Sequence, residues 1–478
     1  MSKYDYNIVV IGAGSGGLVS SLIAAGTQAK VALIEADKMG GDCLNTGCVP
    51  SKALIKVAKT VYEIQQADKY GIHCNAPEVD FQAVMQHVHN AIKTIEPHDS
   101  IERFTQLGVD CFQGHAFIED PHHVRIGEQI LSTKNIIIAT GAKASVPDIS
   151  GLSQVDYLTS DNLWQLQKLP KKLLILGAGP IGVEMAQAFQ RLGSEVTLAD
   201  RNSRLLKVED NDVSEHLLQQ FESEGIHCLL NHQLSSMDAQ RNTATFICHD
   251  EKRQVSFDKV LICLGRSANI SGFGLEALGV EINAKKRIQS NAFLQTNIAN
   301  IFVCGDVTGP YQFTHAASHQ AWTATVNALF SPLKRFKINY DNMAWCTFVD
   351  PQIARLGINE QEAQQQSIAY EVSRYDFADL DRAICEGKNQ GFIKVLNKPG
   401  SDKILGVSIV AEHAGELLAE FALAKTHGLG LNKILSTLHI YPSWSEANKF
   451  VAGEWRKKHI PAFALTVLNL FHQLRTRL

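Results

Sequence analysis

The chain has 478 residues, 45% of them apolar and 20% charged, so it can fold into about three domains and is too apolar to be disordered. A net charge of −4 gives no basic excess, which argues against nucleic acid as a partner. The apolar runs are too short for a membrane span or a signal peptide, and ten cysteines are too few for a disulfide scaffold, so we expect a cytoplasmic protein.

The first predicted element is a buried strand at residues 8–11, which runs directly into a glycine-rich turn. The turn contains Gly12, Gly14 and Gly17, and a helical stretch follows it. A second apolar strand, residues 31–34, then ends at Glu35. This arrangement is typical of a dinucleotide-binding βαβ unit, in which the pyrophosphate lies at the helix N-terminus and the acid binds a ribose.

A cysteine pair follows this unit, within residues 40–52. Four residues separate Cys43 from Cys48, a spacing short enough for a reducible disulfide at the start of a helix. Zinc would require a second ligand pair, which we do not find, and the small polar neighbours make poor core material. The pattern therefore favours redox chemistry over a metal site or an inert buried pair.

The strand–turn–helix pattern occurs again in the middle of the chain. A strand at residues 173–176 leads into Gly177, Gly179 and Gly182, and the next strand ends at Asp200. Two such copies predict two doubly wound domains, although either copy alone could be a structural turn. Three more apolar strands end in small-residue turns, at Thr140-Gly141, at Gly265-Arg266 and at Gly305-Asp306.

The pattern changes from about residue 336. Alternating stretches at residues 392–396 and 405–410 predict an antiparallel sheet, and residues 415–428 predict a helix. The expected fold class is therefore α/β, with two doubly wound, Rossmann-like dinucleotide-binding domains and a C-terminal α+β domain.

In these motifs the chain resembles the pyridine nucleotide–disulfide oxidoreductases, which include dihydrolipoamide dehydrogenase, glutathione reductase and mercuric reductase. Both glycine motifs, the cysteine segment and the three small-residue turns follow the order of that family. The resemblance implies an FAD-binding domain (residues 1–150 and 280–335), an NAD(P)H-binding domain (151–279) and a dimerisation domain with an extended tail (336–478). It also implies a homodimer that transfers electrons to a small dithiol–disulfide or another acceptor.

The resemblance further implies roles for single residues. Cys43 would exchange with the substrate, Cys48 would lie beside the flavin, and Lys52 would pair with Glu184. Gly12, Gly14 and Gly17 would hold the FAD pyrophosphate, Glu35 its adenosine ribose and Asp306 its ribityl chain. The full set expected at the cofactors is Gly12, Gly14, Gly17, Glu35, Gly41, Thr140, Gly141, Asp306, Gly177, Gly179, Gly182, Asp200, Arg201 and Gly265.

One position departs from the pattern of the disulfide-reducing relatives. Those relatives carry a catalytic histidine before a proline and a later glutamate, whereas this sequence has Tyr441 before Pro442, with Glu446 in place. A tyrosine with a pKa near 10 is a poor base at neutral pH, so we expect slow turnover of lipoamide or glutathione. His439 would substitute only if its loop rotated inward, and otherwise it is structural.

Three functions therefore stay open at this stage. The first is dihydrolipoamide dehydrogenase-like electron transfer between NAD(P)H and a disulfide. The second is mercuric reductase-like reduction of a metal ion, since those enzymes also carry the tyrosine; however, their C-terminal cysteine pair has no counterpart, because the last cysteine here is Cys385. The third is a flavoprotein of low turnover with a binding or structural role.

Two further expectations concern the nucleotide and the tail. Asp200 would accept a hydrogen bond from a ribose hydroxyl and repel a 2′-phosphate, so we expect NAD(H) to be preferred, although Arg201 and Lys207 lie where NADPH-using relatives bind the phosphate. Residues 456–478 are apolar in the middle and basic at both ends. We favour a helix packed on the dimer over an amphipathic helix on a membrane surface.

Overall fold

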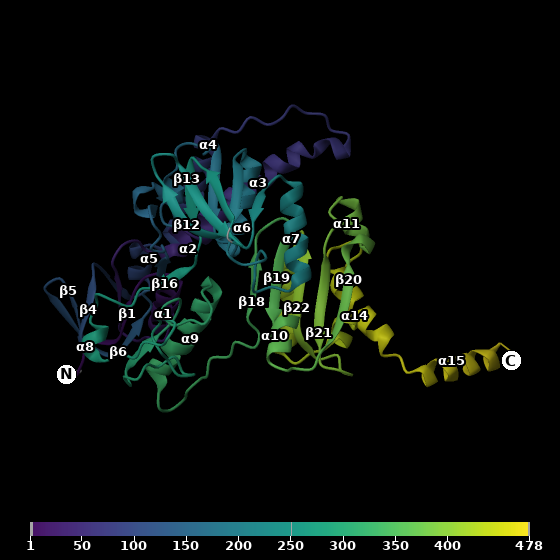
Figure 1. Cartoon of the computed structure of the whole chain (residues 1–478). Coiled ribbons are helices and arrows are strands. Elements are labelled where there is room, and N and C mark those ends of the chain that lie inside the picture. Colours follow the sequence, from purple (N-terminus) through teal and green to yellow (C-terminus); the bar gives the residue numbers. More distant parts are fainter. Residues whose placement is uncertain (1–2, 250, 477–478) are drawn as a thin grey trace. The chain divides into compact units, whose positions relative to one another are not determined.

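The structure is a computed structural model, and it describes residues 3–249 and 251–476 (Figure 1). The chain divides into two compact units. The first contains Met1–Leu205 and Phe221–Asn339, and the second contains Leu206–Gln220 and Tyr340–Leu478. The two units are described separately below.

The first unit contains a seven-stranded sheet with strand order β3-β2-β1-β6-β5-β4, and β17 also pairs with β6. The pairs among β3, β2, β1, β6 and β17 are parallel, whereas β4, β5 and β6 form an antiparallel meander. The strands are β1 (Tyr6–Ile11), β2 (Val31–Glu35), β3 (Val109–Gln113), β4 (Ala116–Asp120), β5 (His123–Ile126), β6 (Gln129–Ile138) and β17 (Ile301–Val303).

Successive residues of the central strand β1 belong to different cores. Val9 and Ile11 pack in one buried cluster, while Ile8 and Val10 pack in another. Because alternate side chains point to opposite faces, both faces of the sheet are covered, as a parallel sheet requires. Helices α1 (Ser15–Gly26) and α9 (Thr314–Phe330) pack against each other beside this sheet (Figure 1).

The remaining helices of this part of the first unit include α2 and α3, which each carry one cysteine of the pair. These helices are α2 (Gly41–Asn45), α3 (Cys48–Gln65), α4 (Phe81–Ile95), α5 (Ile101–Gln106) and α8 (Leu275–Leu278). Helix α3 packs against α4 and also against α6 (Pro180–Leu192), which follows the second glycine turn.

A second sheet in the same unit is wholly parallel, with strand order β11-β10-β9-β15-β8. Its strands are β8 (Tyr157–Leu158), β9 (Lys172–Leu176), β10 (Glu195–Ala199), β11 (His227–Leu229) and β15 (Lys259–Ile262), and α6 spans Pro180–Leu192. Two smaller antiparallel sheets consist of β12 (Gln233–Asp238), β13 (Thr243–Cys248) and β14 (Glu251–Ser256), and of β7 (Ala142–Ala144) with β16 (Arg266–Ala268). Helix α7 (Asn211–Ser223) crosses the boundary between the units.

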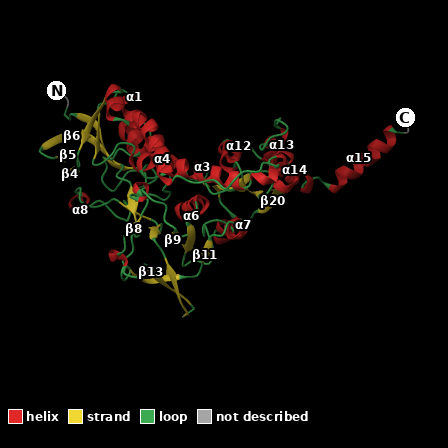
Figure 2. Cartoon of the chain, turned by 90° about the horizontal axis from the view of Figure 1, so that it is seen from above, coloured by secondary structure: helices red, strands yellow, loops and turns green. Residues whose placement is uncertain are grey.

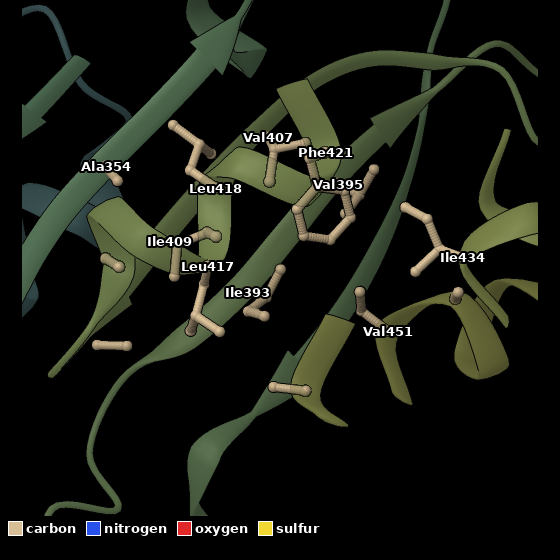
Figure 3. Packing of buried hydrophobic residues seen from close by; sticks show 14 of the residues in the cluster. Ala354, Ile393, Val395, Val407, Ile409, Leu417, Leu418, Phe421, Ile434 and Val451 are labelled. Atoms are coloured by element: carbon tan, nitrogen blue, oxygen red, sulfur yellow. The ribbon is translucent and has the colours of Figure 1, made fainter. Parts of the chain in front are cut away.

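The second unit contains a five-stranded antiparallel sheet with order β18-β19-β22-β21-β20. Apolar side chains of this sheet, such as Ile393 and Ile409, meet Phe421 and Val451 from the covering helices (Figure 3). Its elements are β18 (Ala344–Thr347), β19 (Gln352–Gly357), β20 (Glu371–Asp376), β21 (Phe392–Asn397), β22 (Ile404–Ala411), α10 (Glu360–Gln365), α11 (Asp381–Cys385), α12 (Ala414–Thr426), α13 (Leu431–Ser436), α14 (Glu446–Lys458) and α15 (Ala462–Arg475) (Figure 2).

A buried lysine on β21 organises the charges of this unit. The side chain of Lys394 is 2% exposed, and its Nζ lies 2.8 Å from carboxylate oxygens of Asp210, Asp212 and Glu360. The hydrogen bonds to these carboxylates raise the pKa of Lys394 despite its burial, so it stays charged. The ion cluster ties residues 206–220 to the C-terminal sheet.

The predicted α/β fold class is confirmed by this arrangement. The two glycine motifs each lie between a parallel strand and a helix, and the segment after residue 336 forms the predicted antiparallel sheet with helix α12. Among the described residues, no helix is both long and apolar enough to cross a membrane.

Candidate active site

The first glycine turn has a backbone that only glycine fits. Gly12 has a φ of +99°, and a Cβ there would lie 2.5 Å from the carbonyl oxygen of Ala139. A Cβ at Gly17 would lie 1.7 Å from the carbonyl oxygen of Gly12, so α1 can start close to the strand only because residue 17 lacks a side chain. Gly14 lies between them in extended backbone and caps α1.

The second glycine turn repeats this geometry. Gly177 has a φ of +106°, and a Cβ at Gly182 would lie 1.8 Å from the carbonyl oxygen of Gly177. Gly179 caps α6 in extended backbone, and a Cβ there would meet no described atom within 4 Å. Both turns thus present open backbone at a helix N-terminus, where amide groups and the helix dipole favour a phosphate.

The two acids that close the second strands occupy matching positions. Glu35 Oε2 accepts a hydrogen bond from the amide of Ala13 at 2.5 Å, and Asp200 Oδ2 accepts one from the amide of Ala178 at 2.7 Å. In each case the donor is the residue after the first glycine of the turn. The carboxylates are therefore held beside the turns, and Arg201 follows Asp200 with an exposed side chain.

Four further residues predicted to bind cofactors lie around these turns. A Cβ at Gly41 would lie 2.6 Å from the Cα of Gly14, so the start of α2 approaches the first turn closely. Gly141 and Gly265 both have positive φ, and a Cβ at either would meet no described atom within 4 Å. The hydroxyl of Thr140 instead donates to the carbonyl of Asn269 at 2.8 Å, which secures the turn.

The two cysteines meet at the start of helix α3. Cys43 lies on α2 and is half-buried, whereas Cys48 is the first residue of α3 and is exposed; both are thiols in this structure. A hydrogen bond from Cys43 lowers the pKa of the Cys48 thiol to about 6, and the same bond, with burial, raises the pKa of Cys43. The N-terminus of α3 favours the same thiolate, because the positive end of the helix dipole lies at residue 48.

Two other side chains surround Cys48. Its Sγ lies 3.4 Å from the hydroxyl of Thr314 at the start of α9, which helps to lower the pKa of Cys48. Lys52 follows Cys48 by one helical turn, lowers the same pKa by its charge, and donates to Glu184 Oε2 at 2.8 Å. Glu184 lies on α6 and is 7% exposed, so the predicted Lys52–Glu184 pair is present in the structure.

Asp306 belongs to a charged group that sequence reasoning did not single out. Arg266 forms ion pairs with both Asp42, next to Cys43, and Asp306, whose Oδ2 lies 3.4 Å from Arg266 Nε. Burial raises the pKa of Asp306, and the Arg266 guanidinium opposes that rise. Arg266 and Thr314 are both additions to the predicted site. Arg266 lies in one of the small-residue turns that follow the family order, but nothing local to either residue indicated a partner.

The residues predicted to complete the site from the C-terminal domain lie in the second unit. Tyr441 is 68% exposed, and its hydroxyl donates to Asp381 Oδ2 at 3.0 Å, which raises the pKa of Tyr441. Glu446 is buried at the start of α14 and accepts from the amide of Ser443. His439 is held by Glu420, with Nε2 3.1 Å from Oε1, which agrees with its structural interpretation.

The donor sets fit two dinucleotides. Each glycine turn offers open helix-terminal amides to a pyrophosphate, and each acid lies where a ribose would reach it. Among the described residues, no group of three or more histidine, cysteine or acidic side chains could hold a metal ion. Two doubly wound sheets beside a cysteine pair at a helix start are the features of an oxidoreductase that uses dinucleotide cofactors.

Comparison with known proteins gives the family. The pyridine nucleotide-disulphide oxidoreductase model matches residues 6–321, and the dimerisation domain of the same family matches residues 343–451. The chain belongs to this family of FAD-dependent enzymes, which use NAD(P)H.

Its relatives span several activities. The chain is 32% identical over 447 residues to a dihydrolipoyl dehydrogenase from Chlamydia muridarum, covering 92% of this chain and 95% of the relative. It is 31% identical over 449 residues to a mercuric reductase from Bacillus cereus, covering 94% and 71%. Among solved structures, the HOCl-induced flavoprotein disulfide reductase RclA from Escherichia coli is 26% identical, with a TM-score of 0.84 over 94% of this chain and 99% of that one.

Proposed function

We propose that the protein transfers electrons from NAD(P)H, through FAD and the Cys43–Cys48 pair, to an acceptor that reacts with thiols. The observation that carries this proposal is the placement of Cys43 beside Cys48 at the N-terminus of α3, with Lys52 one turn away and held by Glu184. Bound FAD would supply the ring that takes up hydride and reduces the disulfide.

Different residues of the chain would bind the FAD and carry out the thiol chemistry. The turn at Gly12, Gly14 and Gly17, with Glu35, would bind FAD, and Asp306 would bind its ribityl chain. Cys48 would face the flavin, while Cys43 would attack the acceptor. The Lys52 ammonium, held by Glu184, would stabilise negative charge on the reduced flavin and on the Cys48 thiolate.

We propose that the FAD domain comprises residues 1–150 and 280–335, because β17 pairs with β6 although 163 positions separate the last residue of β6, Ile138, from the first residue of β17, Ile301. Residues 151–279 would bind the nicotinamide nucleotide, and residues 336–478 would form the homodimer. The match of the family's dimerisation domain to residues 343–451 supports this last assignment. We also place the protein in the cytoplasm, where the eight cysteines outside the Cys43–Cys48 pair would stay reduced.

The nicotinamide nucleotide would be NADH rather than NADPH. The support is Asp200, whose carboxylate is fixed beside the second glycine turn by the amide of Ala178. A fixed negative charge repels a 2′-phosphate and accepts a bond from a 2′-hydroxyl. Arg201, with its exposed side chain, is the residue that would oppose this preference.

The first candidate acceptor is a small disulfide, as in dihydrolipoamide dehydrogenase. The second is a metal ion, and Tyr441 favours it: a tyrosine whose hydroxyl already donates to Asp381 is poorly suited to take a proton from a dithiol. The relatives include mercuric reductases, and a solved structure of RclA is a Cu(II) complex.

An anaerobic titration of the FAD-loaded protein with NADH, followed by an acceptor panel, tests the proposal. We expect NADH to reduce the flavin and disulfide, and then lipoamide, oxidised glutathione, Hg²⁺ or Cu²⁺ to reoxidise them. Rapid reoxidation by lipoamide alone would support the first acceptor, and rapid reoxidation by a metal ion alone the second. A flavin that neither NADH nor NADPH reduces would contradict both and would leave the binding or structural role, whereas reduction by NADPH alone would contradict only the preference for NADH.

A further inference from the structure

Helix α15 (Ala462–Arg475) has an apolar face that its own unit does not cover. None of its residues is buried, and Phe463, Leu470 and Leu474 are all more than half exposed. Phe463, Val467, Leu470, Phe471 and Leu474 follow the i, i+4, i+7, i+8, i+11 spacing and thus form one stripe. A contiguous exposed apolar stripe marks a surface that binds an apolar partner.

The charges around this stripe are of one sign. Residues 455–478 contain no aspartate or glutamate, whereas the whole chain carries a net charge of −4. Arg456, Lys457 and Lys458 end helix α14 with exposed side chains just before α15, and Arg475 lies in its last turn. Apolar side chains flanked by cations complement an anionic lipid surface, where headgroups attract the cations and acyl chains accept the stripe.

A second copy of the chain is the rival partner, and one observation weighs against it. The matched dimerisation domain ends at residue 451, before α15 begins. Helix α14, in contrast, is fixed to the C-terminal sheet, where the ring of His459 stacks on Trp455 and Nε2 lies 3.1 Å from Glu371.

We propose that α15 docks in the plane of an anionic membrane surface, with its Phe463–Leu474 stripe in the lipid. The helix is too short to span a bilayer, so the attachment would be interfacial. Pro461, in extended backbone before α15, separates this helix from α14. The attachment would therefore leave the folded units outside the lipid, and it is independent of which acceptor the enzyme reduces.

Flotation of the FAD-loaded full chain with vesicles tests this proposal. We expect binding to phosphatidylcholine vesicles that contain about 30% phosphatidylglycerol and little binding to pure phosphatidylcholine. The double variant Val467→Gln, Phe471→Gln should weaken binding about tenfold or more, and Arg456→Gln, Arg475→Gln should weaken it by a similar factor. Asn469→Ser, Gln473→Ser on the polar side of α15 is the matched control and should bind as the wild type does.

Three outcomes would overturn the proposal. One is a wild-type chain that does not float with anionic vesicles, and another is a stripe variant that binds them as strongly as the control. The third is a stripe variant whose assembly has a lower mass than the wild type in analytical ultracentrifugation. That result would show that the stripe binds a second copy of the chain. Flavin absorbance and circular dichroism of each variant verify folding, which these exposed substitutions should not disturb.

Discussion

Lys52 Nζ lies 2.8 Å from Glu184 Oε2, and this ion pair joins the helix that begins at Cys48 to the helix that follows the second glycine turn. The lysine lowers the pKa of Cys48, and the glutamate raises it. Neutralising the two partners should therefore move the same pKa in opposite directions, a signature that a purely structural ion pair would not give.

We expect Lys52→Met to raise the pKa of Cys48 by about one unit and Glu184→Gln to lower it. The measurement is the pH titration of thiolate absorbance in the reduced protein. Lys56→Met, at an exposed position one turn further along α3, is the control and should leave the titration unchanged. Shifts of the same sign in both variants would contradict this assignment.

The hydroxyl of Thr314 should have a comparable effect, because it donates to the thiolate of Cys48. In the wild type, the rate of Cys48 alkylation should decrease as the pH falls through about 6. Thr314→Val should move this midpoint upward by about one unit, while Thr314→Ser should keep it. Mass spectrometry of the alkylated peptide separates Cys48 from Cys43. An unchanged midpoint in the valine variant would show that the hydroxyl does not contribute.

The lowered pKa of Cys48 also makes the stability of the fold depend on pH. Since the folded-state pKa of Cys48 lies below the ordinary thiol value of about 8.5, ionisation of Cys48 stabilises the folded state. This contribution is present in full above that ordinary value and is lost as the pH falls through about 6. Cys48→Ser should remove this part of the pH dependence of unfolding.

Tyr441→His should increase turnover with lipoamide, because a histidine with a pKa near 6.5 can accept the proton that a tyrosine cannot. The increase should be on the order of 10²-fold, the contribution of a positioned general base. Tyr441→Phe removes the hydroxyl that donates to Asp381 without adding a base, and it should not accelerate the reaction. If both variants respond alike, residue 441 does not act as the acid–base group.

Removing the buried cation of the C-terminal unit should destabilise it strongly. Lys394→Met would leave three carboxylates without their shared partner, at a cost of about 3–5 kcal/mol in the free energy of unfolding. Lys398→Met, at an exposed position just after the same strand, should cost little. Urea unfolding followed by tryptophan fluorescence measures both, and equal values would contradict the role of the cluster.

Much of the fold could be predicted from local sequence. Gly12 and Gly177 lie between apolar strands and helices, and the acids Glu35 and Asp200 occur at the ends of the next strands at matching distances, so each unit is specified within about 30 residues. The Lys52–Glu184 pair was predicted only from the resemblance to a family, because nothing in the sequence near either residue indicates its partner.

The contacts that could not be predicted join residues far apart in the chain. Thr314 reaches Cys48 across 266 positions and Arg266 reaches Asp42 across 224, and both contacts depend on how the helices and loops pack around the sheets. The ion cluster at Lys394 likewise requires residues 206–220 to pack on a sheet that begins at Ala344. Periodicity predicts which face is buried, but it does not predict which charges will meet there.

The hydrogen bonds from Ala13 to Glu35 and from Ala178 to Asp200 have a consequence for cofactor affinity. A carboxylate already fixed by a backbone amide has little rotamer freedom left to lose when a ribose arrives. The conformational entropy of each carboxylate side chain is thus already lost during folding, before any ligand is present. Substituting either acid should therefore speed the release of its nucleotide more than the loss of a flexible side chain of equal contact energy would. Loosening the turn itself should also weaken binding, without removing any ligand contact.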